Sequence, residues 1–448
     1  MLKESLANEP RIVRKVPMDS SPVSLRTVPA AEKHRPLIAF FDYPDVFEDF
    51  YPHYGVSQHE FATRWHNTAN HAWLAIIQKE IGDVVWYQNS LRPEVTAENH
   101  EFVGCRVKFV ASSWLHRLLW KAFYLPSCAW RWQRFYRAYA LVASYLAPLS
   151  WRLFRTLRHD RPDVLYVQDY CSGRYDVLLL FAKLLGIPCL TFHSGSTSDK
   201  YLGKSIRPYT IRRADWIFPS GNNERKLLED KFGFPSSRQS IIRPPIDTAI
   251  YRPMDRNEAC AAYQLDSKKR YFIFVGRLDD SVKRLSAIIS VFADLCADHK
   301  TCDLLIVGNG KDERALKHQA EEMIPGRVRF LGWIGDDRQK ALALNTADCL
   351  LLASWREASP AVIGEAFACG VPVLSSRVGC IDDLVTDGET GWLFEAGDDD
   401  GLRRAMEGIM KSHKAVESMR GTVRQRALDL VSIDAVCGAL REGFSRFI

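Results

Sequence analysis

Residues 354–376, SWREASPAVIGEAFACGVPVLSS, hold a short helical pattern between two apolar runs. Ser359 is a good N-cap residue, and Pro360 suits the first helical position, where its missing N–H costs nothing. Gly370 suits the left-handed residue that stops a helix. These signals predict a helix over 360–369. Because this helix would join two apolar strands, the stretch is typical of a sheet with parallel strands.

Two glutamates flank the start of the predicted helix. Glu357 comes just before it, and Glu365 lies one to two turns inside it. A helix N-terminus offers unpaired N–H groups and a positive dipole end, which together favour a phosphate. Carboxylates beside a phosphate need another role, and binding sugar hydroxyls is the natural one. The apolar neighbours of Glu365 indicate burial rather than an exposed helix position, and a buried carboxylate is rarely left unpaired.

Strands and helices alternate along both halves of the chain. In the second half, strands are expected at 271–275, 303–307, 327–330, 348–352 and 372–375, with helices at 283–298, 311–321, 336–345 and 360–369. In the first half, strands are expected at 36–41, 84–87, 105–110, 163–167, 188–192, 215–218 and 240–243, with helices at 58–80, 175–185, 200–213 and 222–232. The proline-rich connector 244–253 separates the two series. Such alternation predicts βαβ units.

The chain is therefore expected to be an α/β protein with two doubly wound, Rossmann-like domains that face a cleft. Its 448 residues suit two or three domains of ordinary size. The expected division is a mobile polar tail at 1–35, an N-terminal domain at 36–248, a C-terminal domain at 249–430, and a final helix at 431–448 that could pack back on the N-terminal domain. Ligands of such sheets bind outside the carboxyl ends of the strands.

Further motifs fall in the expected strand-to-helix loops of the second half. Gly276 permits close approach of a backbone, and Arg277 and Lys283 could grip a diphosphate from two sides. Two solvated cations at a helix start are the alternative. Gly308-Asn-Gly310 forms a small turn after the next strand. By itself this turn is a weak signal, because the third glycine of a dinucleotide fingerprint is absent.

As an ordered set, these motifs resemble the family 4 retaining glycosyltransferases. The spacing Glu357-x7-Glu365, followed by Cys369-Gly370 and Pro372-Val373, resembles the family's nucleotide-sugar signature. The matching motifs are Gly276-Arg277…Lys283, Gly308-x-Gly310, Phe330-Leu-Gly332, Ala214-Asp215 and Ile246-Asp247…Tyr251-Arg-Pro253. The resemblance covers residues 160–430 and, more loosely, 36–160. It implies the two-domain GT-B fold, with the donor bound on the C-terminal domain without a metal.

The resemblance also implies roles by position. Arg277 and Lys283 would bind the donor diphosphate. Glu365 would hold the ribose hydroxyls, and Glu357 would act as a catalytic residue on the transferred sugar. The donor-binding residues expected in this way are Gly276, Arg277, Lys283, Gly308, Gly310, Gly332, Trp333, Ile334, Ser359, Ala361, Val362 and Glu365. Among them, the stretch Gly332-Trp333-Ile334 would lie near the base.

His193 is the second expected catalytic residue. It ends an expected strand, where cleft residues belong, and stands at the position of a histidine in the family's acceptor domain. A hydrogen-bonded core histidine is the alternative. The chain departs from the family pattern at three pairs: Lys283-Arg284 replaces the frequent Lys-Gly, Gly379-Cys380 replaces Gly-Gly, and Pro244-Pro245 replaces Asn-Gly. The glycine-rich loop after the first strand is missing, which affects acceptor recognition more than donor binding.

The implied function is retaining transfer of a hexose from a nucleotide diphosphate sugar to a hydroxyl of a glycan or lipid-linked acceptor, as in cell-envelope or exopolysaccharide synthesis. No cofactor and no metal are expected. One alternative is a protein that binds nucleotide sugars without transferring them. Another is a metal-dependent transferase of the single-domain type, which would need an Asp-x-Asp motif. The adjacent pairs Asp279-Asp280, Asp336-Asp337 and Asp382-Asp383 do not have that spacing.

A basic, aromatic segment separates the first strands from the later ones. Residues 102–159 contain no acidic residue, ten Lys or Arg, and five of the twelve tryptophans. Within it, residues 113–139 include an amphipathic helical pattern of Trp and Leu with cations. Such stretches prefer an anionic membrane interface, and core packing is the alternative. No RNA-binding motif accompanies the segment, so nucleic acid is not an expected partner.

Composition bounds the remaining possibilities. Hydrophobic residues make up 47% and charged residues 25%, which excludes a wholly disordered or fibrous chain. Residues 1–250 hold 33 Lys or Arg against 24 Asp or Glu, so the first half is basic and suits an anionic partner. The N-terminus has no signal-peptide pattern, and the eleven cysteines form no CxxC pair. A cytoplasmic chain, peripheral on the inner face of the membrane, is expected.

Overall fold

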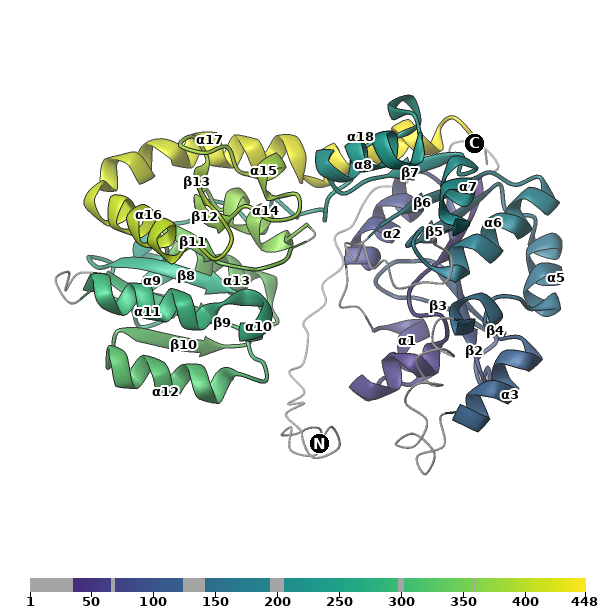
Figure 1. The fold of residues 1–448 in the computed structure, drawn as a ribbon, viewed down its shortest axis with the longest axis horizontal. Coiled ribbons are helices and arrows are strands. Elements are labelled where there is room, and N and C mark those ends of the chain that lie inside the picture. The colour runs from purple at the N-terminus through teal and green to yellow at the C-terminus, as the bar shows by residue number, and fades with distance from the viewer. Residues whose placement is uncertain (1–34, 66–68, 124–141, 194–204, 297–301, 358) are drawn as a thin grey trace, which may run out of the picture. The chain divides into compact units, whose positions relative to one another are not determined.

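The computed structural model describes residues 35–65, 69–123, 142–193, 205–296, 302–357 and 359–448. The expected mobile tail lies outside this part of the chain, apart from Arg35. The described residues form two sheets whose neighbouring strands are parallel except at one edge, and helices cover both faces of each sheet (Figure 1). Each sheet is built from the strand–helix alternation that the sequence predicts.

The first sheet has seven strands and belongs to the first half of the chain. Their spatial order is β3 (Ala97–Asn99), β4 (Arg106–Ala111), β2 (Asp83–Ser90), β1 (Leu37–Phe41), β5 (Val164–Gln168), β6 (Cys189–Phe192) and β7 (Trp216–Phe218). Only the edge strand β3 is antiparallel to its neighbour. Ile38 and Phe40 point to one core and Ala39 and Phe41 to the other, as the period of two requires.

Helices on the two faces bury these cores. The helices of this half are α1 (Gln58–Thr63), α2 (Ala69–Glu80), α3 (Trp114–Phe123), α5 (Trp151–Asp160), α6 (Gly173–Leu185), α7 (Arg207–Arg212) and α8 (Asn222–Phe232). Helices α1 and α2 contribute to one core, and α5 to α8 contribute to the other. Strands β5 and β6 are fully buried, so the loops that follow them are firmly placed.

The second sheet has six strands, all parallel. Their order is β10 (Val328–Gly332), β9 (Cys302–Val307), β8 (Arg270–Val275), β11 (Cys349–Leu352), β12 (Val373–Ser376) and β13 (Gly391–Phe394). The helices of this half are α9 (Arg256–Ala262), α10 (Asp280–Lys283), α11 (Leu285–Cys296), α12 (Glu313–Met323), α13 (Asp337–Asn345), α14 (Ala361–Ala368), α15 (Ile381–Leu384), α16 (Asp399–Lys411) and α17 (His413–Leu430). One continuous apolar core joins them.

The last helix, α18 (Ile433–Phe444), packs on the first sheet rather than on the second. Its Val436, Leu440 and Phe444 are buried in the core of the first sheet. The Phe444 ring lies 5.3 Å from that of Tyr166 and 5.9 Å from that of Phe218. The chain therefore returns to its first half after completing the second.

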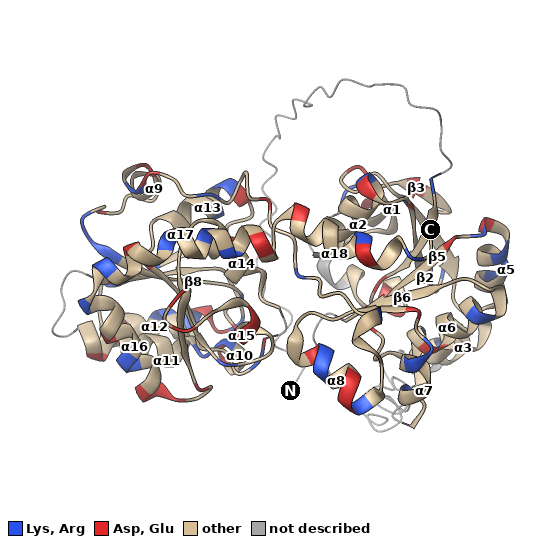
Figure 2. Cartoon of the chain, turned by 90° about the horizontal axis from the view of Figure 1, so that it is seen from above, with Lys and Arg blue, Asp and Glu red and all other residues tan. Residues whose placement is uncertain are grey.

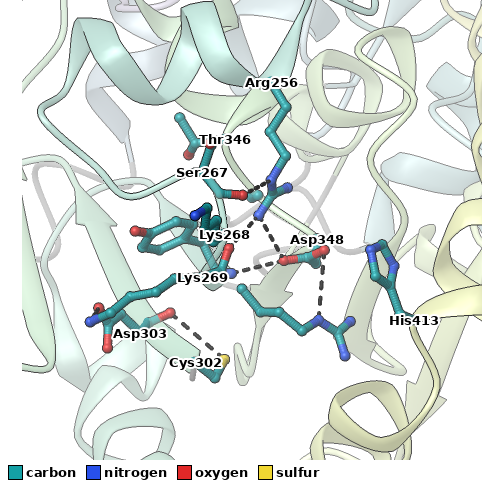
Figure 3. A network of polar contacts seen from close by, with 12 residues as sticks. Arg256, Ser267, Lys268, Lys269, Cys302, Asp303, Thr346, Asp348 and His413 are labelled. Carbon is teal, nitrogen blue, oxygen red and sulfur yellow. Dashed lines mark hydrogen bonds and ion pairs between the residues drawn. The ribbon is translucent and has the colours of Figure 1, made fainter. Parts of the chain in front are cut away.

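An aspartate at the amino end of β11 belongs to a structural network and not to a ligand site (Figure 3). Asp348 accepts hydrogen bonds from the Tyr271 backbone N–H at 2.8 Å and from the Arg256 guanidinium at 3.2 Å. Asp215 plays the same part in the first sheet, where it accepts from the Cys189 N–H at 2.8 Å. Each aspartate follows an alanine and ties two neighbouring strands at the end opposite to their carboxyl ends.

Several expected elements differ from the observed ones. The single helix expected at 58–80 is wrong: α1 ends at Thr63, and Arg64 and Trp65 are not helical. The strand expected at 240–243 is absent, because only Gln239 pairs there, as an isolated bridge to Ile217. The helix expected at 283–298 is broken at Arg284 into α10 and α11.

Candidate functional site

Four loops carry the expected donor-binding residues, and all follow strands of the second sheet. They come after β8, β9, β10 and β11, which are neighbours in the order β10-β9-β8-β11 (Figure 1). Because carboxyl ends of parallel strands meet at one edge, these loops gather at the same edge. The sequence-predicted residues of the second half are therefore brought together, whereas His193 belongs to the first sheet.

The glycines in two of these loops allow their backbones to touch. A Cβ on Gly308 would lie 1.9 Å from the Gly276 carbonyl oxygen, and Gly308 has φ +136°. A Cβ on Gly310 would lie 2.4 Å from the Leu278 carbonyl oxygen. The Leu278 N–H donates to the Asn309 carbonyl at 2.8 Å. The turn at 308–310 therefore fits directly against the loop after β8, and only glycine permits this approach.

The two cations of the loop after β8 differ in their surroundings. Arg277 is exposed. Lys283 ends helix α10, and its Nζ lies 2.6 Å from the Glu357 carboxylate oxygen Oε1. This pair is largely buried, with 18% of the lysine side chain and 9% of the glutamate side chain exposed. The structure thus places Lys283, which is predicted to bind the diphosphate, in direct contact with Glu357, a predicted catalytic residue.

Glu357 is held by its own loop as well. The Ser354 hydroxyl donates to Glu357 Oε1 at 2.6 Å, and the Ser376 hydroxyl donates to the Ser354 carbonyl at 2.7 Å. Ser354 and Ser376 are fully buried at the ends of adjacent strands. These contacts fix one oxygen of the Glu357 carboxylate.

Glu365 is buried and paired, as the sequence predicts. Its carboxylate lies 2.8 Å from the Nζ of Lys340 on helix α13, and the residue is 9% exposed. Burial raises the pKa of Glu365, while the ammonium of Lys340 opposes that rise. The Tyr251 hydroxyl, which donates to Asp337 at 2.7 Å, also lies beside this pair. Sequence reasoning missed Lys340, because no short-range spacing links it to Glu365.

Helix α14 starts one residue later than expected. It begins at Ala361 with Pro360 as its N-cap, so Ser359 precedes the N-cap and the prediction that it caps the helix is wrong. Ala361 and Val362 form the first turn and are partly exposed. No acidic residue lies in this turn, which leaves the positive end of the helix dipole without a negative side chain of its own. Gly370, with φ +73°, stops the helix as predicted.

The stretch expected near a base projects from the end of β10. Gly332 has φ +74°, and the Gly308 N–H donates to its carbonyl at 2.8 Å. Trp333 is 68% exposed, and Ile334 packs against the core. A large exposed aromatic ring beside a glycine turn is able to stack on a planar ligand.

His193 follows β6 in the first sheet and is paired with an aspartate. Its Nδ1 lies 2.9 Å from Asp169 Oδ1, and its residue exposure is 4%. Burial opposes the charged imidazole, but the Asp169 carboxylate outweighs it and raises the pKa of His193. Nε2 of His193 has no hydrogen-bond partner among the described residues. Asp169 follows the neighbouring strand β5, so adjacent strand ends could have revealed the pair.

A cavity of about 290 Å³ opens beside His193. Trp73 and Phe192 give it aromatic walls, and Asp42, Asn70 and Gln168 give it polar ones. The Asn70 amide donates to Asp42 at 2.6 Å and to Gln168 at 2.7 Å, while the Tyr51 hydroxyl donates to Asp42 at 3.0 Å. Sequence reasoning identified none of these wall residues, because they come from the loop after β1, from helix α2 and from the ends of β5 and β6, which lie far apart in the sequence.

One group of side chains in the described part of the chain has ligand atoms close enough to hold a metal ion. The atoms of Asp169, Cys171 and His193 lie within 4.8 Å of one another. The Cys171 thiol is protonated at neutral pH, because burial raises its pKa to about 12. Thiolate is the form that binds metals. The set therefore fits a metal poorly in this state, and the His193–Asp169 hydrogen bond already occupies two of its atoms.

The basic, aromatic segment is only partly described, because 124–141 lie outside the described residues. In helix α3, Trp114 is 70% and Leu118 is 56% exposed, whereas His116 is buried. In helix α5, Trp151 is 63% exposed, and the three arginines of this helix are exposed as well. Figure 2 shows basic residues on α5. The apolar side chains of these two helices are thus not all buried in the core. No described helix combines the length and the apolar composition that a bilayer crossing would require.

Comparison with known proteins identifies two matching family descriptions. Residues 255–426 match the glycosyl transferases group 1 family, and residues 104–250 match Glycosyltransferase Family 4. The phosphatidyl-myo-inositol mannosyltransferase of Mycolicibacterium smegmatis is 34% identical over 253 residues, which are 56% of this chain and 62% of that protein. The N-acetyl-alpha-D-glucosaminyl L-malate synthase of Bacillus anthracis is 29% identical over 181 residues, which are 40% of this chain and 46% of that protein.

The chain spans about half the length of the curated relatives that it matches. Solved structures with a similar fold match a larger share of this chain than the curated relatives do. HepE of Anabaena in complex with UDP has a TM-score of 0.66 at 15% identity, over 92% of this chain and 100% of that one. Sucrose-phosphate synthase of Thermosynechococcus elongatus has a TM-score of 0.64 at 17% identity, over 92% and 99%. The fold is GT-B, as expected, and is not that of a single-domain transferase.

Proposed function

This chain belongs to the group 1 glycosyl transferases of the family 4 type, and we propose that it is a metal-independent, retaining glycosyltransferase. It moves a hexose from a nucleotide diphosphate sugar to a hydroxyl of a glycan or lipid-linked acceptor, as in cell-envelope or exopolysaccharide synthesis. The observation that carries this proposal is the pair of buried carboxylates, Glu357 and Glu365, at one edge of the second sheet. Each is matched with its own lysine, Lys283 or Lys340.

The donor binds along this edge from base to sugar. Trp333 stacks on the base, Glu365 accepts the ribose hydroxyls, and the turn at 308–310 lets the backbone approach the diphosphate. Arg277 and Lys283 bind the diphosphate together with the N-terminus of α14. The similar fold of HepE, whose structures contain UDP and UDP-glucose, supports a uridine diphosphate sugar as the donor class.

In the proposed transfer reaction, the catalytic residues act on the charges that develop as the donor bond breaks. As the bond from sugar to diphosphate breaks, negative charge grows on the leaving group and positive charge grows on the sugar ring. Lys283, Arg277 and the α14 dipole stabilise the leaving group. The acceptor hydroxyl attacks from the face that the diphosphate leaves and gives its proton to the departing phosphate oxygen, so that the anomeric configuration is kept. Glu357 contacts the sugar whose charge changes, and its effect is therefore larger in the transition state than in the bound donor.

The first sheet supplies the acceptor side. The cavity beside His193 offers aromatic walls for a sugar ring and side-chain oxygens and amides for its hydroxyls. Nε2 of His193 is available to the acceptor hydroxyl, since its other nitrogen is held by Asp169. The exposed tryptophans of α3 and α5, among cations, support contact with an anionic membrane surface where a lipid-linked acceptor would reside.

Donor turnover tests this function without knowledge of the acceptor. The protein is incubated with a panel of nucleotide diphosphate sugars, with and without a chelator, and release of the nucleotide diphosphate is measured. We expect slow release from at least one donor, unchanged by the chelator and strongly reduced in Glu357→Gln. Binding of a donor without any turnover would instead indicate a nucleotide-sugar-binding protein. Loss of turnover in the chelator would contradict metal independence.

A further inference from the structure

Arg284 occupies a backbone conformation that favours glycine. It follows the last residue of α10, and its φ is +53° and its ψ +42°. Residues with a Cβ rarely adopt this region, because the backbone conformation costs them free energy whatever the length of the side chain. The side chain is nevertheless buried, with 9% of the residue exposed. Side-chain contacts must therefore hold Arg284 in place.

Two contacts do so. The Arg284 Nη2 lies 2.6 Å from the Asp399 carboxylate at the start of α16. The guanidinium carbon lies 4.6 Å from the ring centroid of Trp355, a cation–π contact. The ring also packs against Gly397, where a Cβ would lie 2.6 Å from it. Arg284, Trp355, Gly397 and Asp399, here called the Arg284 clamp, thus join the loops that follow β8, β11 and β13.

The Arg284 clamp stands beside the catalytic pair. Lys283 contacts Glu357, and the next residue, Arg284, contacts Trp355, two positions before Glu357. The backbone N–H of Trp355 also donates to the Val282 carbonyl at 2.8 Å. The loop that carries Glu357 is therefore attached to the loop after β8 by three contacts, one at Glu357 and two at Trp355. In one of these contacts, a donor diphosphate would compete with the Glu357 carboxylate for the Lys283 ammonium.

We propose that Arg284 is a positioning residue that holds the loop of Glu357 in its catalytic place when Lys283 turns to the donor. This inference rests on the proposed function of Glu357. Donor binding weakens the Lys283–Glu357 pair, since the ammonium is shared with the diphosphate. The contact of Arg284 with Trp355 does not involve Lys283 and stays intact. Without it, Glu357 would lose a fixed anchor at the moment when its position decides the rate.

Arg284→Gly provides the test, because glycine relieves the backbone conformation while removing the clamp. We expect an unchanged or higher melting temperature, nucleotide diphosphate affinity within about twofold of the wild type, and donor turnover reduced about tenfold or more. Arg161→Gly is the matched control. Arg161 is an exposed arginine that also follows a helix with positive φ, at +47°, but it lies after α5 in the first half of the chain. Its replacement should leave turnover unchanged.

A double-mutant cycle with Glu357→Gln shows whether Arg284 acts through Glu357. We expect Arg284→Gly to slow the Glu357→Gln protein by less than about twofold, because the group that it positions is already altered. Losses that multiply, or turnover at the wild-type rate in Arg284→Gly, would overturn the positioning role alone. Turnover at the wild-type rate in Glu357→Gln would overturn the proposed function of Glu357 and this inference with it.

Discussion

Glu357 and Glu365 are eight positions apart in the sequence but face different neighbours. Glu357 lies in a loop, fixed by Ser354 and Lys283, whereas Glu365 lies inside helix α14, against Lys340. Each lysine neutralises a carboxylate that would otherwise be costly to bury. In the proposed function, a bound donor would contact two preformed ion pairs, the Lys283–Glu357 pair near the sugar and the Lys340–Glu365 pair near the ribose.

The contribution of Lys283 to donor binding can be measured by truncation. Lys283→Ala removes a charge-assisted contact and should weaken donor binding by about 1.5–3 kcal/mol and slow turnover. Arg277→Ala should do the same. Lys411→Ala is the control, because Lys411 makes an exposed pair with Glu407 on α16, worth a few tenths of a kcal/mol. Titration with a donor sugar nucleotide would measure each change, and wild-type affinity in both variants would contradict the diphosphate assignment.

Asp42 makes the stability of the protein depend on pH. Burial raises the pKa of Asp42 to about 7, although hydrogen bonds from Tyr51 and Asn70 oppose the rise. An unfolded aspartate ionises near pH 4, so between about pH 4 and 7 the folded protein binds more protons than the unfolded one. The Asp42 carboxyl therefore destabilises the protein progressively as the pH rises through this window.

Asp42→Asn should remove this dependence. The melting temperature of the variant relative to the wild type should increase between about pH 4.5 and 7.5. Asp230→Asn, at an exposed position on α8, should show no such trend. Melting scans at several pH values would measure both. A constant difference between Asp42→Asn and the wild type across the window would show that Asp42 ionises in the folded protein as it does in the unfolded chain.

At the residue scale, the sequence predicted which side chains gather at the edge of the second sheet better than which ones line the cavity beside His193. Glu357, Glu365, Lys283 and the glycine turn are close together in sequence motifs, and adjacent strands place the motifs at one edge. Their partners were not predictable in this way. Lys340 reaches Glu365 from a separate helix, and the cavity beside His193 collects side chains from residues 42, 70, 73, 168 and 192. Only tertiary structure brings such distant positions together.

At the scale of elements, the turn at 308–310 determines how the loops after β8 and β9 fit together. Gly310→Ala would place a Cβ 2.4 Å from the Leu278 carbonyl oxygen. Backbone must move to accommodate it, so we expect destabilisation of about 1–3 kcal/mol together with weaker donor binding. Gly421→Ala, within helix α17 and in open space, should instead stabilise the protein by about 0.5–1 kcal/mol.

Melting scans of the two alanine variants, paired with a donor titration, would measure these opposite effects. If Gly310→Ala melted at or above the wild-type temperature, the close contact between the loops would not exist. If it melted lower but kept full donor affinity, the turn would be structural only.

The element boundaries that the sequence failed to predict have identifiable causes. The apolar period over 283–298 continues through Arg284, and no glycine or proline marks the break. The left-handed residue there depends on Trp355 and Asp399, which lie far along the chain. A strand is expected over 240–243, but the backbone there makes no ladder: Gln239, just before it, forms an isolated bridge, and Ile242 donates one hydrogen bond to the Pro219 carbonyl. Local patterns show which residues are apolar, whereas the available partners decide which of them pair.

At the scale of the whole molecule, the charge is asymmetric, and large apolar side chains are exposed on the basic half. The basic first half carries the exposed Trp114, Leu118 and Trp151. We expect the protein to bind vesicles that contain anionic lipid and to dissociate as salt rises, because attraction fades over about 10 Å at 0.1 M. The double variant Trp114→Ala, Leu118→Ala should bind these vesicles more weakly, because it has less apolar surface to bury in the membrane interface.

Trp333→Ala is the control in vesicle sedimentation, because Trp333 is equally exposed, at 68%, but belongs to the donor edge. It should bind vesicles as the wild type does. Equal binding to neutral vesicles would contradict an electrostatic contact. No binding to either kind of vesicle would indicate that the tryptophans of α3 and α5 serve another contact.

The division of labour between the two glutamates is the central claim, and one titration tests it most directly. The bare nucleotide diphosphate is titrated into the wild type, Glu365→Gln and Glu357→Gln, with initial rates of donor turnover measured alongside. Glu365→Gln should bind the nucleotide about tenfold more weakly or worse, since it loses charge-assisted bonds to the ribose. Glu357→Gln should bind it within about twofold of the wild type while kcat falls about 100-fold, roughly 2.7 kcal/mol. Loss of nucleotide affinity in Glu357→Gln, with affinity kept in Glu365→Gln, would contradict the account.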